Sequence, residues 1–354
     1  MYLLGRLNMG GVEISALRLL THLTAQYRVN PVIYAISGQT GYLDDRFRSV
    51  GATILYGKPG ALGLLAFFKH VRAQRPDIVH SNVSLPSGFY LLIAWLAGVK
   101  IRIAQFHSTA LPQRSVLHRA QSSVGRLLVN RFATHIVGVS DGTRSLVRAA
   151  PEKWQVIYNG VPAANDVALA GSNPFLITLL GRLAPEKNLE KAVEIFGHLK
   201  SMGDQKWKMQ FVGPGTSDET TALKAKVLAA GLERDVHVTG PTDNPLVVLK
   251  GSGLLLLTSN REGLPTVVLE ALSVGTPVVA SALPGVLEIA GQVNGVIAVP
   301  VAAPADEWTR AITQSAAASR QTIASGFAHG PFGLDRQVER IARLWTLEAK
   351  DAKP

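Results

Sequence analysis

Short apolar runs alternate with segments of helical periodicity along the whole chain, and this alternation constrains the fold most. In the first half the runs are Met1–Leu4, Pro31–Ile36, Ala52–Tyr56, Asp77–His80, Ile101–Phe106 and His135–Val139. In the second half they are Phe175–Leu180, Met209–Val212, Val236–Thr239, Leu254–Thr258, Pro277–Ser281 and Val296–Val299. Such runs, bounded by Gly, Pro or Asn and separated by helices, are typical of parallel sheets covered on both faces. Because the pattern occurs twice, we predict an α/β chain with two Rossmann-like, doubly wound domains.

The best candidate for a linker is the small, polar stretch Ala163–Pro174, which follows a turn-forming Asn-Gly-Val-Pro sequence. Turn-forming dipeptides and weak periodicity are typical of domain boundaries. We therefore expect an N-terminal domain over residues 1–165, a C-terminal domain over 166–330 and a last segment over 331–354. That segment contains the amphipathic helix Asp335–Leu347, which could pack on either domain. The N-terminal domain is the candidate for this packing.

Composition excludes several classes of protein. The chain has 354 residues, of which 47% are hydrophobic and 17% charged, and disordered chains have the opposite balance. It has no cysteine, which excludes a disulfide scaffold and a thiolate metal site. The longest apolar stretch, Gly88–Val99, has twelve residues, whereas a bilayer-spanning helix needs about 20. Since the N-terminus has no signal-peptide pattern, we expect a soluble, cytoplasmic protein.

Positive charge is concentrated in the first half. Residues 1–165 contain 18 Lys and Arg against 6 Asp and Glu, whereas residues 166–354 contain 18 against 19. The two candidate partners for a basic half of this kind are nucleic acid and an anionic membrane surface. The aromatic content is only 6%, and no zinc spacing, basic-region heptad or RNA-recognition motif is present. We therefore expect no nucleic-acid partner.

Two segments of the basic half have the pattern of basic amphipathic helices. They are Ala61–Arg75 and Leu111–Phe132, each with apolar residues at helical spacing beside Lys or Arg. Such helices can lie in a lipid interface, but an ordinary helix with one face in the core has the same pattern. The net charge of the whole half favours membrane contact, so we expect peripheral association with the anionic inner face of the cell membrane.

Loops that follow predicted strands carry the candidate ligand-binding residues. One contains Gly10 and Gly11 and opens a helix, so its backbone can approach an anionic ligand, although most such pairs are only tight turns. Another contains Arg182 and Lys187, which are five residues apart and could close on one diphosphate at the carboxyl edge of a sheet. The alternative for this loop is a surface turn in which Glu186 neutralises a neighbour.

A third candidate is the motif Ser259–Ala271, whose helix is predicted to begin with Pro265. The N–H groups of Thr266 and Val267 would then point from the helix N-terminus toward phosphate oxygens. Glu270 lies in an otherwise apolar run, where a carboxylate needs hydrogen-bond partners such as sugar or ribose hydroxyls. The alternative is that Glu270 lies on a solvated face of the helix.

In their order along nearly the whole chain, these motifs resemble the retaining, nucleotide-sugar-dependent glycosyltransferases of family GT4. The segments that carry the resemblance are the Gly10-Gly11 loop, Gly181-Arg182 with Lys187, the pair Glu262 and Glu270, and Asp77–His80, Val137–Ser140, Val156–Val161 and Phe211–Gly215. Members of this family have the GT-B fold, so the resemblance implies two Rossmann-like domains facing each other across an interdomain cleft. One departure is Pro265, where many members have a glycine.

The resemblance also implies roles for particular residues. Arg182 and Lys187 would bind the donor diphosphate and stabilise the leaving nucleotide. Glu262 would hold hydroxyls of the donor sugar, and Glu270 would hold the ribose. His107, at the end of an N-terminal strand, would contact the donor sugar, although a lone histidine is more often structural. The other donor-binding residues implied are Gly10 and Gly11 from the opposite domain, and Gly213, Gly263, Leu264, Thr266 and Val267.

The expected function is transfer of a sugar from a UDP- or GDP-sugar to a hydroxyl of a glycan or lipid-linked acceptor, with retention, in bacterial cell-surface polysaccharide biosynthesis. The sequence has no Asp-x-Asp pair for Mg²⁺, so we expect no metal and no cofactor. The positive charge that stabilises the leaving diphosphate would come from Arg182, Lys187 and helix N-termini. This role fails if neighbouring acidic side chains hold both cations in ion pairs. The alternatives are a nucleotide-sugar epimerase of the same fold, a nicotinamide or flavin oxidoreductase, and a basic non-catalytic protein that binds nucleic acid or membrane.

Overall fold

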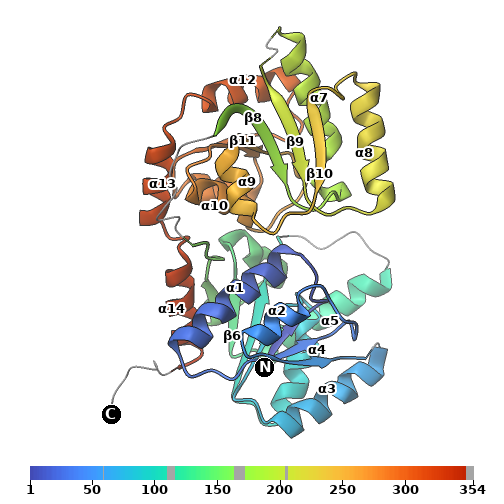
Figure 1. The fold of residues 1–354 in the computed structure, drawn as a ribbon. Coiled ribbons are helices and arrows are strands. Elements are labelled where there is room, and N and C mark those ends of the chain that lie inside the picture. Colours follow the sequence, from blue (N-terminus) through green and yellow to red (C-terminus); the bar gives the residue numbers. More distant parts are fainter. Residues whose placement is uncertain (59, 110–115, 163–171, 204–205, 348–354) are drawn as a thin grey trace. The chain divides into compact units, whose positions relative to one another are not determined.

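The computed structural model describes residues 1–58, 60–109, 116–162, 172–203 and 206–347 and divides into two compact units (Figure 1). Unit 1 comprises Met1–Gly160 and the C-terminal segment from Leu334, and unit 2 comprises Val161–Gly333. The expected boundary after residue 165 falls among residues 163–171, which lie outside the described residues. The chain therefore leaves unit 1 after the seventh strand of that unit and returns to it with its last helix.

The sheet of unit 1 has seven parallel strands in the order β3-β2-β1-β4-β5-β6-β7. They are β1 (Tyr2–Leu4), β2 (Val32–Ala35), β3 (Thr53–Tyr56), β4 (Ile78–Ser81), β5 (Ile101–Phe106), β6 (His135–Gly138) and β7 (Trp154–Val156). The first six coincide closely with the predicted apolar runs. The edge strand β7 was not predicted, because its three residues include a glutamine and form no apolar run.

Helices cover both faces of this sheet, as right-handed crossovers between parallel strands require. The helices are α1 (Gly11–Gln26), α2 (Asp44–Ser49), α3 (Gly60–Gln74), α4 (Ser87–Leu96), α5 (Val116–Phe132), α6 (Arg144–Val147) and α14 (Leu334–Leu344), with 3-10 turns η1 (Asp141–Thr143) and η2 (Pro151–Lys153). The side chains of β1 alternate between two cores. Tyr2 and Leu4 pack with α1 and α14, whereas Leu3 packs with α3, α4 and α5.

The last helix, α14, is part of the core of unit 1 and packs on α1. Its apolar side chains include Val338 and Ile341, and Trp345 follows it into the same core. The indole Nε1 of Trp345 donates a hydrogen bond to Nδ1 of buried His80 over 3.1 Å. Gln337 accepts a hydrogen bond of 2.8 Å from the backbone N–H of Gly160, where the chain leaves the unit.

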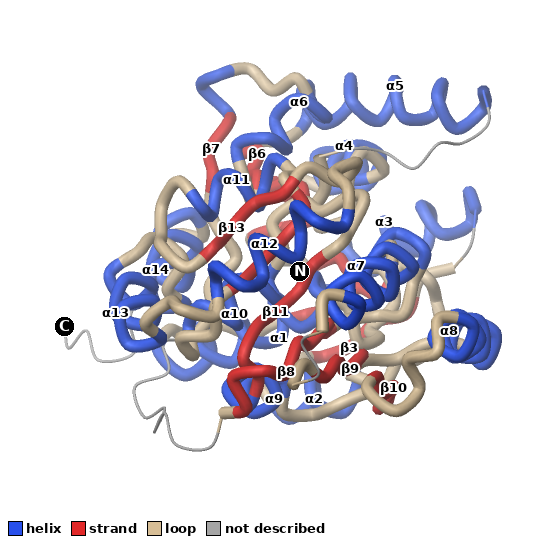
Figure 2. Tube along the Cα trace, turned by 90° about the horizontal axis from the view of Figure 1, so that it is seen from above, coloured by secondary structure: helices blue, strands red, loops and turns tan. Residues whose placement is uncertain are grey.

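Unit 2 has a sheet of six parallel strands in the order β10-β9-β8-β11-β12-β13. The strands are β8 (Asn173–Leu180), β9 (Lys208–Val212), β10 (Val236–Gly240), β11 (Ser252–Leu257), β12 (Val278–Ser281) and β13 (Val296–Val299). All six correspond to predicted runs. In Figure 2 strands β13, β11 and β8, in red, run between blue helices.

The helices of unit 2 also form two layers. They are α7 (Leu189–Ser201), α8 (Ser217–Ala229), α9 (Pro245–Gly251), α10 (Thr266–Ser273), α11 (Pro284–Ala290), α12 (Ala305–Ser315) and α13 (Arg320–His329), with a 3-10 turn, η3 (Pro185–Lys187). Helix α7 packs against α8 and α12, whereas α10 packs against α9 and α13. The predicted α/β class, with two Rossmann-like domains, is confirmed. Among the described residues, no helix has both the length and the apolar character needed to cross a bilayer.

Candidate functional site

The loops that follow β8 and β9 meet at the carboxyl edge of the sheet in unit 2. Gly181 and Gly213 have φ values of +147° and +151°, which favour glycine. A Cβ added to Gly213 would lie 1.9 Å from the carbonyl oxygen of Gly181. The close approach of these two backbones therefore requires glycine at position 213, whether or not a ligand binds there.

Lys187 and Glu262, which are 75 residues apart in the sequence, form an ion pair at this edge. The Nζ of Lys187 lies 2.6 Å from Oε1 of Glu262, and the hydroxyl of Ser259 donates to the same oxygen over 2.8 Å. The side chains of Lys187 and Glu262 are only 19% and 17% exposed. Asn260 ties the two loops together, because its N–H donates to the carbonyl of Glu186.

Arg182 also has an acidic partner. Its Nη2 lies 2.8 Å from Oε1 of Glu186, and the guanidinium side chain is 57% exposed. The sequence left open a surface turn in which Glu186 neutralises a neighbouring side chain. The structure has this arrangement, with Arg182 as the neighbour. Both predicted diphosphate cations are thus paired with carboxylates, one at the surface and one half-buried. A small cavity of about 20 Å³ lies beside them, lined in part by Gly181, Arg182, Lys187 and Thr258.

Helix α10 begins one residue later than expected, because Pro265 is its N-cap residue and not its first helical residue. No described side chain caps this helix, and the first N–H groups of a helix have no partner within it. Thr266 and Val267 are therefore the residues whose N–H groups face outward from the positive end of α10. The preceding Gly263 and Leu264 are buried.

Glu270 is buried within α10 and only 6% exposed. The alternative that it lies on a solvated face of the helix is therefore wrong. A buried carboxylate is stable only when hydrogen-bonded or charge-paired, so Glu270 occupies a site that supplies such contacts.

In unit 1, the predicted glycine loop follows β1 and leads into α1, with Gly10 as N-cap and Gly11 as the first helical residue. The carboxylate of Glu13, in the first turn of α1, lies against Gly10. A Cβ added to Gly10 would be 2.5 Å from its Oε2. An acidic side chain thus already lies at the positive end of α1.

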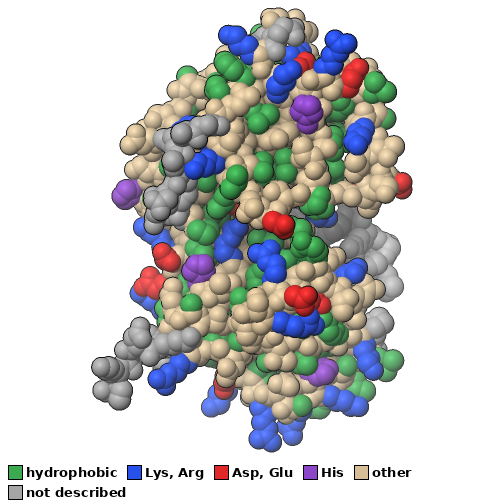
Figure 3. Space-filling view, in the orientation of Figure 1, with side chains coloured by type: hydrophobic (Ala, Val, Ile, Leu, Met, Phe, Trp, Pro, Cys, Tyr) green, Lys and Arg blue, Asp and Glu red, His purple; other side chains and the backbone are tan. Residues whose placement is uncertain are grey.

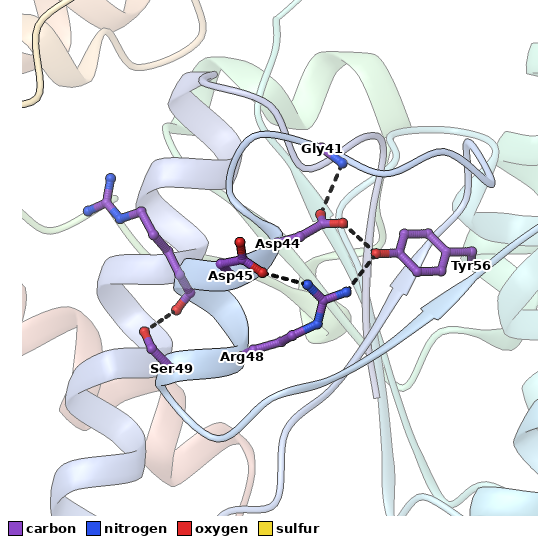
Figure 4. Close-up of polar contacts among 7 residues, drawn as sticks. Gly41, Asp44, Asp45, Arg48, Ser49 and Tyr56 are labelled. Atoms are coloured by element: carbon purple, nitrogen blue, oxygen red, sulfur yellow. Dashed lines mark hydrogen bonds and ion pairs between the residues drawn. The ribbon is translucent and has the colours of Figure 1, made fainter.

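The cluster in Figure 4 fixes the segment that follows β2, which lies beside the glycine loop. Buried Asp44 accepts hydrogen bonds from the N–H of Gly41, over 3.1 Å, and from the hydroxyl of Tyr56. The N–H of Tyr42 in turn donates to Oδ1 of Asn8 over 3.2 Å, and the N–H of Leu43 donates to the carbonyl of Leu7. Hydrogen bonds therefore join the loop that follows β1 to the loop that follows β2, at one edge of the sheet.

His107 follows β5 and is oriented by Asn82, which follows β4. Its Nε2 lies 2.9 Å from Oδ1 of Asn82, and the amide nitrogen of Asn82 donates to the carbonyl of Leu3. Because Oδ1 can only accept, the proton of His107 is on Nε2. Its buried Nδ1 has no partner among the described residues. Burial lowers the pKa of His107 to about 4, so the ring is neutral at pH 7.

Asn82 and Ser259 are the site residues that sequence reasoning missed. A signal for Asn82 was present: β4 and β5 are adjacent parallel strands, so the residues just after them meet at one edge of the sheet. Ser259 begins the predicted motif but has no charge to single it out. Among the described residues, no three His, Asp or Glu side chains gather closely enough to hold a metal ion.

Comparison with a solved structure identifies the class of fold. The structure of Anabaena HepE in complex with UDP and glucose superposes with a TM-score of 0.80 and 20% sequence identity, over 98% of each chain. The fold of this chain is accordingly the GT-B fold, as predicted.

Comparison with sequence families identifies the class of protein. The family model "Glycosyltransferase Family 4" matches residues 9–165, and "Glycosyl transferases group 1" matches residues 164–321. The Staphylococcus aureus capsular polysaccharide biosynthesis glycosyltransferase CapH is 28% identical over 77% of this chain and 78% of its own. The Escherichia coli UDP-Gal:α-D-GlcNAc-diphosphoundecaprenol α-1,3-galactosyltransferase is 25% identical over 73% of each chain. This chain belongs to the GT4-like, group 1 glycosyltransferases.

Proposed function

We propose that this glycosyltransferase moves a sugar from a UDP- or GDP-sugar to a hydroxyl of a glycan or lipid-linked acceptor, with retention, in the synthesis of a bacterial cell-surface polysaccharide. Three similarities support this. HepE was crystallised with UDP and glucose, CapH is named for capsular polysaccharide, and the E. coli relative is named for a UDP-sugar donor and a diphosphoundecaprenol acceptor.

The observation that carries the proposal is the joining of Lys187 and Glu262 from two loops beside the uncapped N-terminus of α10. Cleavage of the bond between sugar and diphosphate leaves negative charge on the phosphate oxygens. Preorganised positive groups that meet such developing charge commonly contribute more to catalysis than any other single effect. Arg182, Lys187 and the N–H groups of Thr266 and Val267 would supply that field, with no metal or other cofactor.

The acids that pair with both cations have to be reconciled with this role. The Arg182–Glu186 pair is solvent-exposed, and such pairs contribute about 0–1 kcal/mol, so a diphosphate can displace Glu186 at little cost. Lys187 has three N–H donors, of which Glu262 needs one. In this proposal Lys187 keeps its bond to Glu262 and turns its other donors to the phosphate.

The remaining groups have hydroxyls as partners. Glu262 would accept from hydroxyls of the donor sugar, and buried Glu270 would accept from the ribose. Gly213, Gly263 and Leu264 would line the donor with their backbones, and Gly10 and Gly11 would approach the diphosphate. His107, neutral at pH 7, would accept a hydrogen bond from the sugar at Nδ1 and would not act as a cation.

The acceptor side of the proposal rests on charge. Unit 1 contains most of the basic half of the chain, and an acceptor carried on a lipid would bring the enzyme to an anionic membrane surface. We propose a cytoplasmic enzyme that associates peripherally with the inner face of the cell membrane. Nucleic acid is not a partner in this proposal.

Substitution of Arg182 tests whether its positive charge stabilises the leaving diphosphate. Arg182→Ala should lower turnover by about 10²–10³, the usual effect of removing one preorganised donor from a developing anion. The measurement is release of nucleoside diphosphate from the preferred donor, chosen beforehand by calorimetry against UDP-, GDP- and ADP-sugars, with a chelator present.

The matched control is Arg310→Ala. Arg310 is exposed, and it pairs with Asp306 four residues away, as Arg182 pairs with Glu186. The control should keep full turnover. Near-normal turnover of Arg182→Ala, or dependence of the wild type on a divalent cation, would contradict the proposal.

A further inference from the structure

The layer formed by α3, α4 and α5 in unit 1 has an outer face with many exposed apolar side chains. Among the described residues of unit 1, six of the seven exposed large hydrophobic side chains lie on these helices. They are Leu62 and Leu65 on α3, Trp95 and Leu96 on α4, and Val124 and Leu127 on α5. Leu62 and Leu127 are each 69% exposed. Helix α4 packs against both α3 and α5, so the three helices form a continuous layer.

On α3 and α5 the apolar side chains share a stripe with cations. Residues three or four positions apart lie on one side of a helix. The stripe of α3 is Leu62, Leu65, Lys69 and Arg72, and the stripe of α5 is Val124, Leu127 and Arg131. The opposite sides of these helices, with Phe67 and Val129, are in the core. Each helix therefore presents leucine or valine followed by Lys or Arg to the solvent.

The cations of this face are not neutralised by acids. Lys69, Arg72, Arg75, Lys100 and Arg119 are exposed, and none of them is ion-paired with a described residue. Between Asp45 and Asp141 the chain has twelve Lys and Arg and one acidic residue, Asp77. Figure 3 shows blue Lys and Arg side chains gathered along the lower margin of this unit.

The C-terminal ends of α4 and α5 join an aromatic pair to a cation. The rings of Trp95 and Phe132 have centroids 5.2 Å apart, and the guanidinium of Arg131 lies 5.4 Å from the centre of the Phe132 ring. Tryptophan near Arg or Lys is typical of the boundary between water and lipid, because its ring is apolar and its N–H is polar.

We propose that the outer face of α3, α4 and α5 docks on an anionic lipid surface. The phosphates of the lipids would meet Lys69, Arg72 and Arg131, and the exposed leucines would enter the headgroup region, as in interfacial helices. A nucleic acid would satisfy the cations but leave the leucines in water, so lipid fits the combination better. This face would make the membrane contact of the proposed function. Its exposed side chains and charges indicate lipid binding independently, and only the reason for docking, a lipid-linked acceptor, rests on the proposed function.

Vesicle co-sedimentation of the full chain tests this surface without donor or acceptor. The protein should bind vesicles of phosphatidylcholine mixed with phosphatidylglycerol, and salt should weaken the binding. Vesicles of phosphatidylcholine alone should bind it poorly. Lys69→Gln with Arg72→Gln should lower the affinity for anionic vesicles about thirtyfold, given the usual contribution of a cation near such lipids. Leu65→Gln with Leu127→Gln should lower it without changing the charge.

Matched variants in unit 2 serve as controls. Leu228→Gln with Val247→Gln removes side chains that are 64% and 66% exposed, and Lys224→Gln with Arg234→Gln removes two exposed cations. Both controls should bind anionic vesicles like the wild type. Equal binding to neutral vesicles, unchanged binding of the α3 and α5 variants, or equal losses in the controls would overturn the inference.

Calorimetry separates this inference from the proposed function. If the wild type binds a nucleotide-sugar but no vesicle, only the docking surface is wrong. If it binds anionic vesicles but no nucleotide-sugar, the proposed function is wrong and the docking surface stands.

Discussion

Gly213 shows how a single residue of the site is determined by backbone packing. It belongs to the motif Phe211–Gly215, and the resemblance to GT4 enzymes implied contact with the donor. The structure gives a separate reason for glycine at this position. Its backbone has a φ of +151°, and a side chain would meet the carbonyl of Gly181. The same approach positions the loop that carries Arg182 and Lys187.

Gly213→Ala should therefore destabilise unit 2 by at least about 1–3 kcal/mol, the usual cost of a backbone conformation that favours glycine, with the clash added. The free energy of unfolding in urea measures this. Gly326→Ala is the control, because Gly326 lies within α13 with no atom near its added Cβ, and alanine there should stabilise the helix by about 0.5–1 kcal/mol. A Gly213→Ala protein as stable as the wild type would show that the two loops do not need this approach.

At the scale of elements, α14 and the residue that follows it, Trp345, are held in unit 1 by buried hydrogen bonds as well as by apolar packing. His80 donates from Nε2 to Gln105 over 2.8 Å and accepts at Nδ1 from Trp345. Burial lowers the pKa of His80 to about 3, so the ring is neutral and can accept. The bond joins β4 to a residue 265 positions later in the chain.

Trp345→Phe should leave Nδ1 of His80 buried without a donor, at a cost of about 1–3 kcal/mol beyond the loss of packing. Trp308→Phe is the matched control, because Trp308 is fully buried but its Nε1 has no acceptor among the described residues. Urea unfolding of both variants measures the difference. A smaller loss for Trp345→Phe than for Trp308→Phe would contradict a stabilising role for the bond.

At the scale of the whole molecule, the two units differ in their buried histidines. His80 and His107 are buried in unit 1, and burial depresses the pKa of both well below the usual 6.5. His198, His237 and His329 of unit 2 are not buried. The unfolded chain therefore binds more protons than folded unit 1 when the pH lies below 6.5.

Unit 1 should lose stability first as the pH falls. The stabilisation from neutral His80 and His107 is fully present above pH 6.5 and is lost as the pH falls toward their folded pKa values of about 3 and 4. Thermal unfolding at neutral and acid pH should show one transition that moves down more steeply. A fragment of residues 161–333, which is continuous and has its own core, identifies the transition of unit 2. The idea is wrong if the transition matched by this fragment is the more acid-sensitive one.

Sequence pattern was sufficient to predict the α/β class, twelve of the strands and the sheet edges at which Arg182, Lys187 and Glu262 lie. Periodicity, turn residues and the order of motifs are local properties, and parallel strands place the residues that follow them at one edge. Long-range packing, in contrast, was needed to reveal the edge strand β7, the bond from His107 to Asn82 and the pairing of Lys187 with Glu262, and to decide which of the two domains α14 packs on. Those contacts join residues far apart along the chain, and their distances depend on how the layers pack, which no local spacing records.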